Sequence, residues 1–75
     1  MTQNGTRTQQ ILLFYKYVTV EDPEALSVWF RQRAASHYLL GRVLVAEEGI
    51  NGTLEGTIRD TEAFAEELLH DPRFS

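Results

Sequence analysis

Residues 41–56 constrain the fold of this chain more than any other stretch. Their sequence is Gly-Arg-Val-Leu-Val-Ala-Glu-Glu-Gly-Ile-Asn-Gly-Thr-Leu-Glu-Gly. Arg42 to Ala46 is a β-branched and apolar run, and Asn51 to Glu55 is a second run of the same kind. Such runs, bounded by glycine, predict two short strands joined by a tight turn.

The position of that turn has two solutions. Glu48-Gly49 lies between the runs, and glycine adopts backbone angles that other residues avoid. Asn51-Gly52 is itself a strong turn signal and is the alternative. We favour the earlier turn, because it leaves Ile50 and Leu54 free to point inward.

Composition limits the rest of the argument. A chain of 75 residues makes one small domain, and its 43% apolar content is enough for a packed core. It contains no cysteine, which excludes disulfides, thiolate metal sites and a cysteine nucleophile. A polar start without a signal peptide, and the lack of any membrane-spanning run, predict a cytoplasmic protein with no membrane partner. The net charge of −4 is unusual for a nucleic-acid binder, so any RNA contact would need a local patch.

The first strand is predicted at Ile11 to Val18, after a polar and flexible tail at residues 1–10. Alternation places Tyr15 and Tyr17 on one face and Lys16 on the other. Both faces are largely apolar, which predicts a central strand, with the tyrosine face the more open one.

Two helices are predicted. Asp22-Pro23-Glu24 is a strong helix start, and that helix runs to about His37. Thr57 caps a second helix, which runs to about His70. The apolar positions at helical spacing are Leu26, Trp29, Phe30 and Ala34 in the first helix, and Thr61, Phe64, Ala65 and Leu68 in the second. Arg33 and Glu67 are expected in solvent, and the two histidines are expected to stand alone.

The resulting order is β-α-β-β-α. It predicts an α+β fold of the ferredoxin-like (split βαβ, acylphosphatase-like) type over residues 11–75, with the fourth strand missing from this chain. Losing that strand leaves Ile11 to Val18 as an open apolar edge. We expect either a homodimer, or aggregation, through this edge, or a longer parent chain that supplies the strand.

Three blocks of the sequence carry a family resemblance: residues 12–18, residues 41–54 and Asp71-Pro72-Arg73-Phe74. Together they resemble the N-terminal domain of the rhodanese-containing tRNA uridine hydroxylases. The resemblance covers Ile11 to the end of the chain, and the Ala-Glu-Glu-Gly-Ile-Asn-Gly-Thr block is long and specific.

The resemblance implies an acylphosphatase-like domain followed by a rhodanese-like domain with an active-site cysteine. It implies oxygen-dependent 5-hydroxylation of the wobble uridine, with molecular oxygen as co-substrate and with tRNA and the rhodanese-like domain as partners. This chain has no cysteine, so it offers no match for that catalytic residue. We expect the piece to be an accessory domain that needs no cofactor and is inactive alone.

Chemistry of its own is not expected. Acylphosphatases that share the fold hold phosphate in a glycine-rich loop with an arginine after the first strand. The corresponding loop, Thr19 to Asp22, has no glycine, no arginine and two acids, which repel phosphate. Those enzymes also use an asparagine on a later strand to orient the attacking water. Asn51 alone does not restore such a site. No sequence cluster supports a metal site.

The candidate contacts, to tRNA or to another domain of the parent, lie in the first strand and in the hairpin. They are Tyr15, Lys16, Tyr17, Arg42, Glu47, Glu48, Gly49, Asn51, Gly52 and Thr53. Spaced tyrosines are typical of sheet faces that stack RNA bases, but they also serve packing and domain docking. The hairpin glycines, Gly49 and Gly52, either allow a partner to approach the backbone closely or are needed only for the bend of the hairpin. The other function that stays open is a structural or protein-interaction module with no RNA contact.

Overall fold

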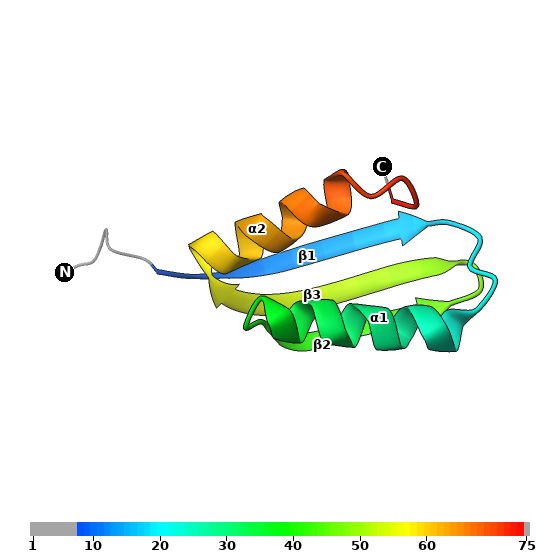
Figure 1. Cartoon of the computed structure of the whole chain (residues 1–75), viewed down its shortest axis with the longest axis horizontal. Helices are drawn as coiled ribbons and strands as arrows, with labels where there is room; N and C mark the ends of the chain where they lie inside the picture. Colours follow the sequence, from blue (N-terminus) through cyan, green and yellow to red (C-terminus); the bar gives the residue numbers. More distant parts are fainter. Residues whose placement is uncertain (1–7, 75) are drawn as a thin grey trace.

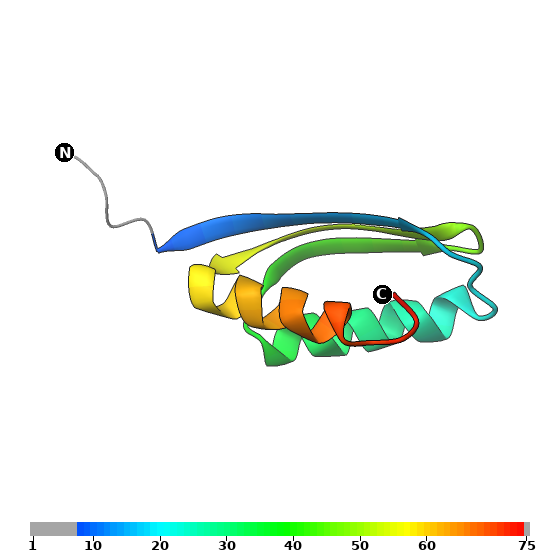
Figure 2. The same ribbon diagram turned by 90° about the horizontal axis from the view of Figure 1, so that it is seen from above.

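The computed structural model describes residues 8–74, in which a three-stranded antiparallel sheet carries two helices on one of its faces (Figures 1 and 2). The elements, in chain order, are β1 (Gln9–Tyr17), α1 (Pro23–Ser36), β2 (Leu40–Ala46), β3 (Gly49–Thr57) and α2 (Ile58–Leu69). The strands are arranged β1-β3-β2, and both neighbouring pairs are antiparallel. This is the predicted α+β, ferredoxin-like arrangement. β1 begins two residues before the predicted start, and most of the predicted tail lies outside the described residues.

Both helices begin where their capping residues predict. The Asp22 carboxylate accepts a hydrogen bond from the Ala25 amide at 3.1 Å. The Thr57 hydroxyl accepts one from the Asp60 amide at 3.0 Å. These bonds satisfy backbone donors that a helix start leaves free, so the caps fix where each helix leaves the sheet.

The core lies between the helices and the sheet. Its buried apolar side chains are Phe30, Ala34, Leu39, Ile50, Leu54, Phe64, Leu68 and Phe74. The Phe14 ring of β1 packs 5.9 Å from Phe30 of α1 and 6.2 Å from Phe64 of α2, measured between ring centroids. Phe74 returns to α1 and lies 5.4 Å from Phe30, so the turn after α2 closes over the same core. Ile50 and Leu54 point inward, as the earlier turn requires.

The hairpin turn consists of Glu47 and Glu48, which confirms the earlier of the two positions. The reason for the glycines differs from the predicted one. Gly49 does not adopt a positive φ; a Cβ there would lie 2.3 Å from the Lys16 carbonyl oxygen. Gly52 faces the helices, where a Cβ would lie 2.1 Å from the Phe14 ring. Both glycines therefore make room for β1, and neither is needed for the bend.

β1 lies at an edge of the described sheet, so the prediction of a central strand is wrong for these residues. It pairs with β3 along its whole length, and its other side faces α2 (Figure 1). An apolar groove of about 260 Å³ lies there. Its apolar lining comes from Leu12, Phe14, Ile50, Ala65, Leu68, Leu69 and Phe74. The open edge that we expect without a fourth strand is therefore present in residues 8–74.

The two helices are joined by ionic contacts, contrary to the expectation that Arg33 and Glu67 stay in solvent. The Arg33 guanidinium donates to both Glu67 carboxylate oxygens at 2.7 Å. His37 Nε2 lies 2.9 Å from the same carboxylate, so this histidine does not stand alone. Hydrogen bonding from Arg33 lowers the pKa of Glu67 to about 2. Helical periodicity missed the contacts because it assigns a face within one helix and does not place the other helix.

Candidate interaction face

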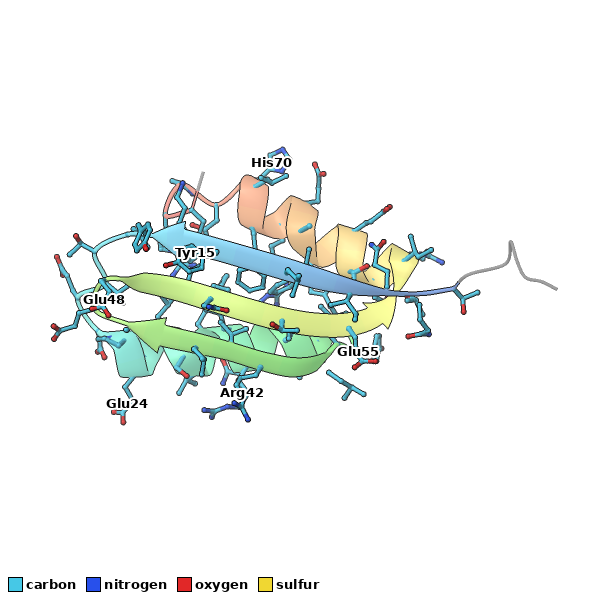
Figure 3. All side chains as sticks on the ribbon, turned by 180° about the vertical axis from the view of Figure 1, so that it is seen from behind. Tyr15, Glu24, Arg42, Glu48, Glu55 and His70 are labelled. Atoms are coloured by element: carbon cyan, nitrogen blue, oxygen red, sulfur yellow. The ribbon has the colours of Figure 1, made fainter. Side chains whose placement is uncertain are left out.

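The face of the sheet away from the helices carries the most distinctive surface of the molecule (Figures 2 and 3). Strand alternation directs every second side chain to this side, and the pairing register sets them in three parallel rows. We call this surface the open face. Its main members are Ile11, Leu13, Tyr15, Tyr17, Leu40, Arg42, Leu44, Asn51, Thr53 and Glu55.

The β1 row of the open face is entirely apolar or aromatic along its central part. Ile11, Leu13, Tyr15 and Tyr17 are 65%, 70%, 60% and 76% exposed. Such side chains are usually buried in a soluble domain, so four in succession on one strand indicate a surface that a partner covers.

The two tyrosines form an ordered pair within that row. Their ring centroids lie 5.0 Å apart at 82°, an edge-to-face contact. A hydrogen bond with Tyr17 raises the pKa of the Tyr15 phenol, and the nearby Glu48 carboxylate acts in the same direction. The Tyr15 phenol is therefore neutral near pH 7 and presents a ring without charge.

The other two rows are more polar. Asn51, Thr53 and Glu55 of β3 lie directly opposite Tyr15, Leu13 and Ile11. Beyond them, β2 contributes Leu40, Arg42 and Leu44. Arg42 and Glu55 point away from the helices in Figure 3. The three described rows thus contain one basic and one acidic side chain, and the apolar character is strongest over β1.

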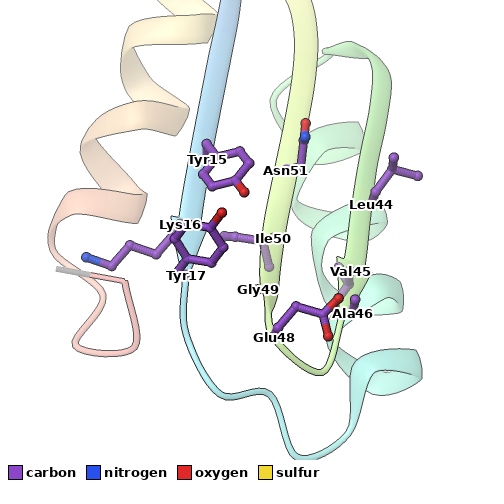
Figure 4. Close-up of a pocket in the computed structure, with 10 residues that line it drawn as sticks. All are labelled: Tyr15, Lys16, Tyr17, Leu44, Val45, Ala46, Glu48, Gly49, Ile50 and Asn51. Atoms are coloured by element: carbon purple, nitrogen blue, oxygen red, sulfur yellow. The ribbon is translucent and has the colours of Figure 1, made fainter.

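A shallow hollow of about 200 Å³ lies at one end of the open face, next to the hairpin turn (Figure 4). Tyr15 and Tyr17 form one side of it, Leu44 and Ala46 lie on the other, and Asn51 faces outward between them. Gly49 has no side chain opposite Tyr17, which is why the surface is hollowed at this point.

The structure brings together half of the predicted contact residues. Tyr15, Tyr17, Arg42, Asn51 and Thr53 share the open face. The exposed Glu47 and Glu48 form the turn beside it, and Gly49 follows them. Lys16 and Gly52 lie on the other side of the sheet, as alternation predicts for Lys16.

Sequence reasoning missed four apolar members of the face. These are Ile11, Leu13, Leu40 and Leu44. The signal was available for two of them, because alternation in β1 places Ile11 and Leu13 on the same side as the tyrosines. Alternation alone does not assign a contact role to Ile11 and Leu13, since a sequence does not say which side of a sheet the helices cover.

The loop after β1 does not form a phosphate cradle. The Val18 amide donates to the Glu48 carbonyl at 3.1 Å, and the Val20 amide donates to the Glu47 carbonyl at 2.9 Å. Because the Val18 and Val20 amides already donate to the hairpin turn, these two amides are not free to bind a phosphate. The acids Glu21 and Asp22 follow directly. The groove of about 540 Å³ beside this loop is lined mainly by apolar groups of the loop, α1 and the C-terminal turn.

Neither a metal-binding group nor a membrane-spanning helix is found between Thr8 and Phe74. No group of three or more His, Asp or Glu side chains in that range is arranged to hold a metal ion. Neither of the helices in that range is long and apolar enough to cross a membrane.

Comparison with known proteins identifies close relatives. Residues 9–75 match the UPF0176 acylphosphatase-like domain. The chain is 52% identical over 65 residues to a tRNA uridine(34) hydroxylase of Enterococcus faecalis, covering 87% of this chain and 21% of that protein. It is 47% identical over 66 residues to the protein of that name in Staphylococcus epidermidis, covering 88% and 21%. The corresponding figures for Bacillus mycoides are 44% over 70 residues, 93% and 22%. The chain thus spans about a fifth of the length of these relatives.

Proposed function

We propose, because the chain belongs to the UPF0176 acylphosphatase-like domain family, that it serves as the accessory N-terminal domain of a tRNA uridine(34) hydroxylase. The observation that carries this proposal is the identity of 44–52% to proteins of that name over most of the chain. Because the chain matches only about a fifth of each relative, the chemistry is assigned to the remainder of the enzyme.

The composition of the domain supports a role outside catalysis. Its sequence contains no cysteine. The amides of Val18 and Val20 are already bonded where an acylphosphatase binds phosphate, and residues 8–74 offer no metal-binding group.

The parent enzyme, in this proposal, works in the cytoplasm and hydroxylates carbon 5 of the wobble uridine with molecular oxygen. A rhodanese-like domain follows the present one and supplies the active-site cysteine. The accessory domain helps to position either the tRNA or that catalytic domain, and needs no cofactor of its own.

A second function, a structural module that never touches RNA, is favoured by one observation. The chain has 11 acids against 7 bases, and Arg42 is the one basic side chain in the three described rows of the open face. Phosphate contact relies on basic groups, so this surface offers little attraction to tRNA.

The proposal is tested with the full-length protein that contains this chain. The purified protein and the isolated 75-residue chain are each incubated with unmodified tRNA in air, and nucleosides are analysed by mass spectrometry. We expect 5-hydroxyuridine at position 34 with the full-length protein and none with the chain alone. Hydroxylation by the isolated chain would contradict the accessory role, and an inactive full-length protein would contradict the assignment to a hydroxylase.

A further inference from the structure

We infer that the open face is the surface through which this domain docks on the remainder of its own enzyme, and that it does not bind RNA bases. The inference rests on the proposed function, since it needs a longer parent chain. It follows from the chemistry of the three rows, from the size of the face and from the length of the relatives.

The chemistry of the face selects a protein partner. Six exposed large apolar side chains lie on it, four of them in succession along β1. A patch of this kind on a small domain marks an interaction site. A base-stacking platform also needs cations that follow the phosphate backbone. Arg42 is balanced here by Glu55, and Glu48 adds a further acid at the end near the tyrosines.

The arrangement of the rows defines what the partner must present. Over β1 it must bring apolar side chains to Leu13 and the tyrosine pair. Over β3 it must bring hydrogen-bonding groups, because Asn51 and Thr53 lie between the apolar rows and lose water on docking. Beside β2, a carboxylate fits the Arg42 guanidinium.

The size of the face favours a tethered partner over a second copy. Three strands of nine, nine and seven residues, about 4.8 Å apart and rising ~3.3 Å per residue, give a flat footprint of roughly 400 Å². Stable complexes between separate proteins bury about 800 Å² on each partner. A linker raises the effective concentration of its domains to the millimolar range, so a smaller interface suffices within one chain. The relatives are about four times as long as this chain, so a longer parent chain of that length would provide such a partner.

The three tyrosines of the chain allow a direct test in the unmodified full-length enzyme. Tyr15 and Tyr17 lie on the open face, whereas Tyr38 follows α1 and is 81% exposed in the isolated domain. The measurement is hydroxyl-radical footprinting with mass spectrometry, with and without unmodified tRNA. Without tRNA, we expect Tyr15 and Tyr17 to be oxidised several-fold more slowly than Tyr38.

Two variants of the full-length enzyme provide the matched comparison. Leu13→Glu places a charge in the apolar row, and we expect it to restore oxidation of Tyr15 and Tyr17, since burying a carboxylate against apolar groups is costly. Val28→Glu introduces the same charge at an exposed apolar position of α1, in the other layer, and should leave the protection unchanged.

Two results would overturn the inference. Protection of Tyr15 and Tyr17 only when tRNA is added would make the face an RNA platform. Oxidation at the rate of Tyr38 under both conditions would leave the face without a partner. Hydroxylation of tRNA by the same preparation is measured separately. A preparation that is active but unprotected therefore overturns the docking inference alone, and one that is protected but inactive overturns the proposed function alone.

Discussion

At the scale of single residues, Gly41 shows how one position determines the start of a strand. Its φ is +131°, and an added Cβ would lie 2.1 Å from the Thr53 carbonyl oxygen in the neighbouring strand. Backbone strain and steric overlap with Thr53 therefore both disfavour any side chain at position 41.

We therefore predict that Gly41→Ala lowers the free energy of unfolding by about 2 kcal/mol or more. The matched control is Gly56→Ala, where the nearest neighbour is the end of the Leu39 side chain, which can move. Urea denaturation followed by circular dichroism measures both. Equal losses in the two variants would show that the backbone of Gly41 is not the cause.

Glu67 carries the second prediction at this scale. Its carboxylate joins α1 to α2 through Arg33 and His37, whereas Glu66 on the same helix approaches only His70, at 3.4 Å in an exposed position. Glu67→Gln should cost about 1 kcal/mol of stability, since the bidentate pair is only partly screened by solvent. Glu66→Gln should cost much less. Chemical denaturation of both variants at pH 7 makes the comparison.

The same carboxylate predicts a pH dependence. The pKa of Glu67 is about 2 in the folded chain against an ordinary value of 4.5. Its contribution is therefore fully present above pH 4.5 and is lost as the pH falls through that window towards 2. The difference in the free energy of unfolding between the unmodified chain and the Glu67→Gln variant should shrink over this range. A difference that stays constant down to pH 2 would contradict the assignment.

At the scale of elements, local chemistry predicted where the two helices begin, whereas each strand begins two residues before its predicted start. Asp22 and Thr57 act through amides three residues away, so a short stretch contains the whole signal. The contacts of Glu67 with His37 and Arg33 span 30 and 34 residues, and no local pattern encodes them. The open face shows the same limit, because alternation gives two sides of a strand without saying which one the helices cover.

The free edge of β1 carries the prediction at this scale. Its unpaired backbone and the apolar groove beside α2 favour pairing with another strand. We expect the isolated chain to show a weight-average mass that rises with concentration in sedimentation equilibrium. In the full-length protein, a strand from the parent chain should protect the β1 amides from hydrogen exchange. A concentration-independent monomer would count against pairing through the edge.

At the scale of the whole molecule, we expect the likeness to acylphosphatases to be a likeness of fold and not of chemistry. In the loop after β1, the amides of Val18 and Val20 are hydrogen-bonded to the hairpin turn, and the acids Glu21 and Asp22 follow. We predict no hydrolysis of an acyl phosphate such as benzoyl phosphate above the buffer rate. Hydrolysis that Asn51→Ala abolishes would contradict this prediction.

We propose that this domain supports a tRNA-modifying enzyme without itself recognising tRNA. An NMR titration of the labelled chain with unmodified tRNA, at low and at physiological salt, tests that claim most directly. For a folded sample, we predict that any shifts at low salt disappear at physiological salt, as expected for screened charge contacts. Shifts of Tyr15, Tyr17 or Asn51 that persist at physiological salt would contradict the claim and would assign tRNA recognition to the open face.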